Sequence, residues 1–382
     1  MLRNLVLVSL LGMGCTTHAY EALRAVRGIK YPNSDAEGTL PVVTTAWTLP
    51  SRAPYTGFSE LIPYALRSPH QQEAGSCLYM SLTGIAEFWL SRLNPDLSRE
   101  PEGPLDLSER HLMNVAAQSE SQLGVENWRT DSVYLMNNWG GLLRNTEYRF
   151  TKGWVLRRGG RYVRVNPHTP GSSYSTRYNW VDEMDSAHST PVTLPRLERE
   201  ILFADPEKDQ WNVGIMPHDI VDTIKRALVE RRAPVHVIYN HYGYWHAVNI
   251  LGFDDQADSK NCSFVRGFFV YMAEKHRDLS DQADQASDPQ RRAELLRAAE
   301  KARRTGLKAQ EAFNRGGGCQ SRGMFYVRDS IYSDANGPVY DYDPAQQGDE
   351  APYARPIVLH EYDWIRYLGN HASVIFLQES SH

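Results

Sequence analysis

Cys77 has the sequence context of a reactive thiol. It follows the small turn Gly75-Ser76 and precedes an apolar run, residues 78–90, in which hydrophobic side chains recur at three- and four-residue spacing. This spacing predicts a largely buried helix that begins at Cys77. The free backbone N–H groups and the positive dipole end at a helix N-terminus favour a thiolate over a thiol. We therefore expect Cys77 to act as a nucleophile.

A thiolate nucleophile needs a proton carrier, and two histidines downstream are candidates. His246 begins the predicted strand 246–253, whereas His241 lies among tyrosines and Gly243 in a predicted loop. An imidazolium beside Cys77 would stabilise the thiolate and later protonate a leaving amine. The strand context favours His246, and His241 is the alternative.

The four cysteines allow one disulfide to be predicted in the body of the protein. Cys15 belongs to the N-terminal apolar segment, which leaves three. Cys262 and Cys319 bracket a segment of different composition, and a bridge between them would contribute up to about 4 kcal/mol by closing a loop of this size. This pairing leaves Cys77 unpaired. The alternative is that Cys262 and Cys319 are two buried thiols.

The first 19 residues have the pattern of a signal peptide. Arg3 precedes a short apolar core, residues 5–13, and small residues follow at 17–19. The core is too short to span a bilayer. We expect an exported protein, periplasmic or secreted. Cys15 loosely resembles a lipoprotein box, so lipid anchoring through it is an alternative.

The composition is that of a globular protein without a nucleic-acid or membrane signature. The 382 residues are 41% hydrophobic and 11% aromatic, and the net charge of −5 comes from 41 basic and 46 acidic residues without a long run of one sign. Histidine and cysteine spacings typical of metal sites are absent from the sequence, and the acidic segment 340–343 lacks the other ligands of a calcium loop. We expect no metal and no cofactor.

The first half is predicted to be mainly helical. Residues 21–69 are rich in proline and form an extended arm or a short pro-segment. Ser108 can cap a helix that turns Leu112 inward, and a further helix over residues 131–138 is ended by Gly140-Gly141.

The second half is predicted to be mainly sheet, with one helical insertion. Strands are expected within 148–165, 235–239 and 246–253, a surface excursion over 168–190, and an amphipathic helix over 217–228. Residues 274–315 are charged and alanine-rich, with a helix start at Asp288-Pro289 and a stop at 316–318. They predict a solvated helical hairpin.

Five landmarks, in this order, resemble those of the papain-like cysteine peptidases. Gln71 stands six residues before Cys77, where that family has its oxyanion glutamine. The other matching segments are Gly75-Ser76-Cys77, Leu107-Ser108-Glu109-Arg110-His111-Leu112, His246-Ala247-Val248 with Gly252-Phe253, and Phe325-Tyr326-Val327-Arg328-Asp329-Ser330.

The resemblance implies a fold and a set of roles. The fold is α+β, a papain-like two-part fold with a helical N-terminal half, an antiparallel β-barrel-like C-terminal half and a helical hairpin insertion. Gln71, or Gln72 if the turn is shifted, would donate to the oxyanion, and Asp329 would orient His246. The expected units are 1–19 (signal), 20–63 (extended N-terminal segment or pro-segment), 64–145 (helical half), 146–272 (sheet half), 273–318 (hairpin) and 319–382 (end of the sheet half).

The implied activity is hydrolysis of peptide bonds in a protein or peptide substrate, through a thioester on Cys77. Three positions depart from the family pattern: Leu78 and Ile331 stand where the family has tryptophan, and Asp329 replaces an asparagine. An aspartate still accepts the imidazole N–H, and its charge favours the imidazolium form. Two rivals remain: a catalytically inactive peptide-binding protein, and a transpeptidase or transglutaminase that uses the same nucleophile.

Overall fold

The computed structural model describes sixteen segments of the chain between residues 57 and 378. These are 57–64, 77–98, 105–109, 111–112, 133, 136–137, 140–145, 147, 154–158, 161–165, 191–204, 216, 219–259, 262–319, 322–330 and 358–378. Several parts of the chain discussed above lie outside them: the predicted signal, most of the predicted extended N-terminal segment, Gln71, Gln72, the excursion over 168–190 and the acidic segment 340–343.

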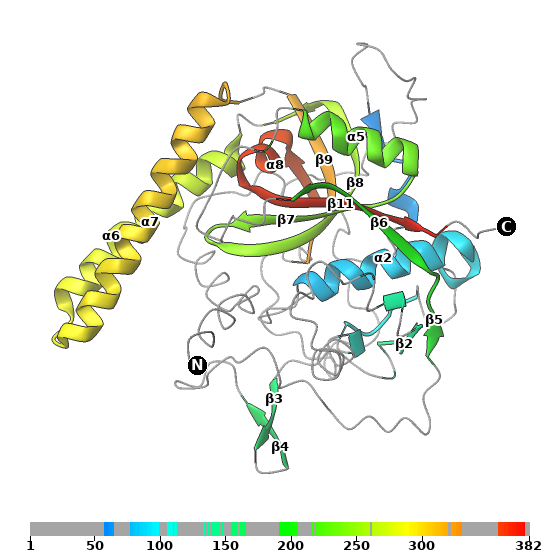
Figure 1. Ribbon diagram of the computed structural model, residues 1–382, viewed down its shortest axis with the longest axis horizontal. Coiled ribbons are helices and arrows are strands. Elements are labelled where there is room, and N and C mark those ends of the chain that lie inside the picture. The colour runs from blue at the N-terminus through cyan, green and yellow to red at the C-terminus, as the bar shows by residue number, and fades with distance from the viewer. Residues whose placement is uncertain are drawn as a thin grey trace, which may run out of the picture.

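A seven-stranded antiparallel sheet forms the centre of the fold, in the order β10-β9-β8-β7-β11-β6 with β1 also paired to β8 (Figure 1). Its strands are β1 (Gly57–Phe58), β6 (Leu197–Ala204), β7 (Val235–His241), β8 (Tyr244–Asp258), β9 (Arg322–Arg328), β10 (Val358–Glu361) and β11 (Gly369–Leu377). The strands predicted at 235–239 and 246–253 are β7 and β8. The molecule is α+β, as expected from the sequence. The expected barrel-like closure is wrong for the described strands, because the edge strands β10 and β6 do not pair with each other.

Helices cover both faces of this sheet (Figure 1). Helix α2 (Cys77–Leu93) lies on one face and begins at the residue expected from the sequence. It is apolar around most of its circumference, and nearly all of it is buried accordingly. Helix α5 (Ile220–Arg231) lies on the opposite face and is followed by the cap residue Arg232, whose φ of 47° is left-handed. The short helix α8 (Tyr362–Leu368) connects β10 to β11.

The smaller elements agree with the sequence where they are described. The backbone N–H of His111 donates to Oγ of Ser108 at 3.0 Å, which is the predicted cap. The described residues of the predicted helix 131–138 are helical, and Gly140 follows with a φ of +75°. The remaining elements are η1 (Ile62–Tyr64), η2 (Pro95–Ser98), the pair β2 (Gly141–Leu142) with β5 (Val192–Thr193), and the hairpin β3 (Trp154–Arg158) with β4 (Arg161–Val165).

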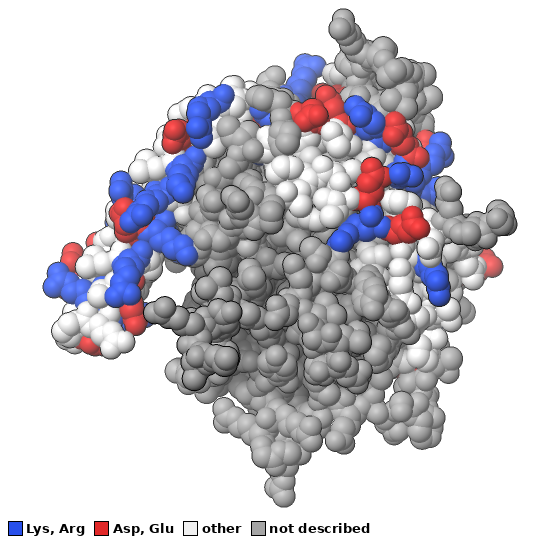
Figure 2. All heavy atoms as spheres, in the orientation of Figure 1, with Lys and Arg blue, Asp and Glu red and all other residues white. Residues whose placement is uncertain are grey.

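The predicted helical hairpin is present and projects from the body (Figure 1). It consists of α6 (Ser263–Gln285) and α7 (Pro289–Arg315). From here on, this helical hairpin is called the arm, and it is distinct from the predicted N-terminal segment 20–63. Asp288 caps α7 by accepting from the backbone N–H of Gln290 at 3.0 Å. The first helix starts earlier than expected, because its first turns are buried against the body. In Figure 2, Lys and Arg side chains line much of the visible side of the arm.

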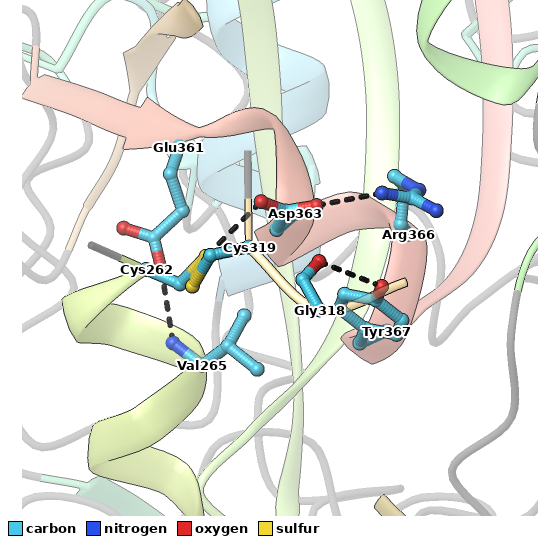
Figure 3. The surroundings of a disulfide bond; sticks show 8 residues. All are labelled: Cys262, Val265, Gly318, Cys319, Glu361, Asp363, Arg366 and Tyr367. Atoms are coloured by element: carbon cyan, nitrogen blue, oxygen red, sulfur yellow. Dashed lines mark hydrogen bonds and ion pairs between the residues drawn. A yellow bond between two sulfur atoms is a disulfide. The ribbon is translucent and has the colours of Figure 1, made fainter. Parts of the chain in front are cut away.

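The base of the arm is fastened to β10 and α8 (Figure 3). Cys262 and Cys319 form the predicted disulfide, with 5.7 Å between their Cα atoms. Oε1 of Glu361 accepts from the backbone N–H of Val265 at 3.0 Å, in the first turn of α6. The hydroxyl of Tyr367 donates to the carbonyl of Gly318 at 3.0 Å. Both ends of the arm are therefore held at one place. Among the described helices, none combines the length and the apolar character needed to cross a membrane.

Candidate active site

The sulfur of Cys77 lies at the start of α2, against the strand that carries His246. Sγ is 3.9 Å from the carbonyl oxygen of Trp245, the residue before His246. The side chain is almost fully buried, with 4% of its surface exposed. The structure thus places the predicted nucleophile beside Trp245, which precedes the predicted base in the chain and lies 168 residues after Cys77.

The structure corrects the expectation that Cys77 is unpaired. Cys77 is disulfide-bonded, and its partner lies outside the described residues. The sequence argument counted three cysteines in the body of the protein, which left Cys77 over once Cys262 and Cys319 were joined. A sulfur in a disulfide cannot attack a carbonyl carbon, so thiolate chemistry at this position requires reduction first.

His246 and Asp329 form a buried pair on neighbouring strands. His246 lies on β8 opposite Tyr239 of β7, and Asp329 directly follows β9, which pairs with β8. Nε2 of His246 is 2.8 Å from Oδ1 of Asp329, and each residue is 1% exposed. Because a carboxylate can only accept, Nε2 carries the proton of this hydrogen bond. The sequence expectation that Asp329 orients His246 agrees with this contact.

Asp329 is held in its ionised form. Burial alone would raise the pKa of this carboxyl, but the charge and hydrogen bond of His246, and then the contact with His360, outweigh burial and lower it well below its usual value. Asp329 is therefore an anion, and its carboxylate stabilises the position of the His246 imidazole.

His241, the alternative base, lies beside His246 without taking its place. Its Nδ1 is 2.9 Å from the hydroxyl of Tyr239, and its ring centroid is 5.5 Å from that of His246. Burial, and then the neighbouring His246, lowers the pKa of His241 well below its usual value. His241 is therefore a neutral packing partner of the site.

Helix α2 is tied to the sheet by a buried hydrogen-bond network. Oγ of Ser81 donates to Oδ1 of Asn249 at 2.6 Å and lies 2.7 Å from Nδ1 of His236, while Nδ2 of Asn249 donates to the carbonyl of Ser81 at 2.7 Å. Since the single hydroxyl proton goes to Asn249, Nδ1 of His236 must donate to Ser81. Burial lowers the pKa of His236 to about 3, which keeps it neutral. This network fixes Cys77 relative to β8.

A buried ion pair also joins α2 to β9, the strand that directly precedes Asp329. Nη2 of Arg328 is 3.1 Å from Oε2 of Glu87, and Nη1 donates to the carbonyl of Met80 at 3.0 Å. Oε1 of Glu87 accepts from the backbone N–H of Leu107 at 2.9 Å. Sequence analysis missed this pair. The sequence signal that indicates such a pair is Glu87 within an otherwise apolar helix, because a buried charge needs a partner of opposite charge.

His360 is the other residue that sequence analysis missed. It lies on β10, and its Nε2 is 3.6 Å from Oδ2 of Asp329. Gln71 and Ile331 lie outside the described residues, so the oxyanion donor stays a prediction. Leu78, which stands in the place of the family's tryptophan, is buried.

Within the described residues, one group of side chains has metal-ligand spacing: Cys262, Cys319 and Asp363. The two sulfurs form the disulfide, which removes them as thiolate ligands.

In comparisons with known proteins, no family model and no curated protein matches this chain.

Proposed function

We propose that this protein is an exported cysteine peptidase of papain-like fold. Cys77 is the nucleophile, His246 the acid and base, and Asp329 the group that orients His246. Gln71 supplies an oxyanion donor together with the backbone N–H of Cys77. No metal or cofactor takes part.

One observation carries this proposal: the buried His246–Asp329 hydrogen bond of 2.8 Å, on the strand whose Trp245 carbonyl lies 3.9 Å from the sulfur of Cys77. The three residues are far apart in sequence and come from α2, β8 and the position directly after β9. Two buried tethers hold these elements together, so the geometry is preorganised, as catalysis requires.

The chemistry follows from the protonation states. Reduced Cys77 transfers its proton to His246, and the thiolate attacks the peptide carbonyl carbon. The imidazolium then protonates the leaving amine, and a thioester remains on Cys77. Water attacks this thioester while His246 accepts its proton, and the acid product leaves as the thiol is restored.

Export is supported by the disulfide at the base of the arm. Cys262–Cys319 is a bridge of the kind that forms and persists in oxidising compartments. The predicted signal over residues 1–19 agrees with it.

The second candidate is a binding protein without turnover. It is favoured by the disulfide at Cys77 and by the 4% exposure of this residue, since both withhold the sulfur from a substrate. If instead an amine resolves the thioester, the protein is a transpeptidase or transglutaminase.

The test compares wild-type protein with Cys77→Ala on a mixed peptide library, with and without a thiol reductant, using mass spectrometry. We expect cleavage by reduced wild type alone, and labelling of Cys77 by a thiol-directed epoxide only after reduction. Cleavage by both proteins excludes Cys77 as the nucleophile. Labelling without cleavage supports the binding protein, and transfer to an added amine supports the transferase.

A matched control separates the two disulfides. Cys262→Ser/Cys319→Ser lacks the bridge at the base of the arm, so reductant can act only elsewhere. Activation that persists in this variant assigns the effect to Cys77.

A further inference from the structure

The carboxylate of Asp329 lies between two imidazoles, one for each oxygen. Nε2 of His246 contacts Oδ1 at 2.8 Å, and Nε2 of His360 lies 3.6 Å from Oδ2. His360 reaches this position from β10, where it is paired with Phe325 of β9. The second separation is longer than a normal hydrogen bond, so His360 acts on the carboxylate as an oriented polar neighbour.

Aromatic side chains fix the ring of His360. It stacks on Trp364 with ring centroids 4.7 Å apart and 22° between the planes, and it meets Phe264 edge-on at 5.1 Å. Tyr239 packs against the rings of both His246 and Trp364. His360 thus faces Asp329 from a rigid, largely apolar wall, where electrostatic contacts are stronger than in water.

Three titratable side chains face Asp329 from the strands packed around it: His246 on β8, His241 on β7 and His360 on β10. His246 and His360 both lower the pKa of Asp329, whereas the hydrogen bond of His241 goes to Tyr239. A carboxylate with one partner can turn about its side-chain bond and exchange its oxygens. A second partner on Oδ2 opposes that rotation.

We propose that His360 is a positioning residue, which fixes the carboxylate of Asp329 so that Oδ1 stays directed at Nε2 of His246. The inference rests on the proposed peptidase function. His360 does not touch the substrate, and its effect on the reaction passes through Asp329. A change at position 360 should therefore matter only while the carboxylate is present.

The test is a double-mutant cycle between His360→Leu and Asp329→Asn. We expect His360→Leu to lower kcat about tenfold with KM unchanged, and to have less than about a twofold effect in the Asp329→Asn background. His360→Gln places an amide N–H near the position of Nε2, so it should retain most of the wild-type kcat. Equal losses in both backgrounds, no loss in His360→Leu, or an equal loss in His360→Gln would each overturn the inference.

Two further variants separate positioning from folding. His371→Leu removes another imidazole, which packs against His236, and its effect should be the same in both backgrounds. If His360→Leu does not fold, His360→Asn replaces it, because the shorter amide stays polar but cannot reach Oδ2.

A readout without turnover distinguishes failure of this inference from failure of the proposed function. If the wild type cleaves nothing, the function fails, and the ring ¹⁵N signals of His246 test the positioning. We expect these signals to shift in His360→Leu and to stay near wild type in His360→Gln. Unchanged signals in His360→Leu would overturn the inference.

Discussion

Asp329 is the residue at which the candidate site is most tightly determined, because it contacts an imidazole through each carboxylate oxygen. Its pairing with His246 was expected from the resemblance of the segment Phe325-Tyr326-Val327-Arg328-Asp329-Ser330 to that of the papain-like family. His360 was not predictable from local sequence. It reaches Asp329 only because β10 pairs with β9 in one register, and a pairing between distant strands leaves no local signal.

Asp329→Asn tests the charge of the orienting group. An aspartate stabilises the imidazolium of His246 and an asparagine does not, so the alkaline limb of the activity profile should lie at higher pH in the wild type. The measurement is kcat/KM against pH for both proteins. Identical profiles would remove Asp329 from the site.

Arg328→Met tests the buried pair that ties α2 to β9. Without the guanidinium, Glu87 remains buried near Glu109, whose pKa is already raised well above its usual value by burial, Asp106 and Glu87. We expect a loss of about 3–5 kcal/mol in the free energy of unfolding, measured with urea. Adding Glu87→Gln should recover part of this loss, since the amide still accepts from Leu107. A loss below about 1 kcal/mol would contradict the assignment.

Gly84→Ala tests the path of Arg328 across α2. Gly84 is the residue of α2 over which the guanidinium lies, and a Cβ there would overlap with Arg328. Although alanine favours a helix by about 1 kcal/mol, we expect net destabilisation in urea unfolding, because overpacking costs about 1–3 kcal/mol. In the Arg328→Met background the same change should cost less. A stabilised Gly84→Ala would show that the arginine moves aside freely.

At the scale of elements, the helices that could be predicted are those whose sequence signals lie within or beside the helix itself. The apolar spacing placed α2, and Asp288-Pro289 placed the start of α7. The start of α6 was missed, because the predicted segment began where its charges begin. Its first turns, which include Phe264 and Phe268, are apolar because the body buries them.

The disulfide at the base of the arm allows a prediction at this scale. Cys262→Ser/Cys319→Ser should lower the free energy of unfolding by up to about 4 kcal/mol, since the bridge closes a loop with a sequence separation of 57. Limited proteolysis should also cut faster near the base of the arm than in wild type. Unchanged cleavage would mean that Glu361 and Tyr367 hold the base without the bridge.

At the scale of the whole molecule, buried titratable groups set the pH range of stability. Burial lowers the pKa of His111 and of His371 to about 4 and that of His236 to about 3. Their contribution is present above the unfolded value of 6.5 and is lost as the pH falls through these values. Burial raises the pKa of Glu361 to about 8, so its contribution is present below 4.5 and is lost as the pH rises through 8.

We therefore expect the free energy of unfolding to be greatest near pH 6.5, measured by urea unfolding between pH 4 and 9. The matched control is Glu361→Gln, which keeps an acceptor for the backbone N–H of Val265 but cannot ionise. It should weaken the decline above pH 6.5, steepen the rise between pH 4.5 and 6.5, and leave the profile below pH 4.5 unchanged. An equal decline in both proteins would contradict the role of Glu361.

The two ends of the arm lie where a turn between β8 and β9 would lie. Asp258 and Arg322 are paired across β8 and β9, beyond a register shift between Asp254 and Asp258, so the pairing of these strands extends to both ends of the insertion. The Cα atoms of Cys262 and Cys319 are 5.7 Å apart, within the span of about 7 Å that a four-residue turn bridges. Two long helices thus occupy the place of a tight β-turn. The outer part of the arm could therefore be exchanged for another segment, whereas the first turns of α6 must stay, because Phe264 is buried and packs against His360.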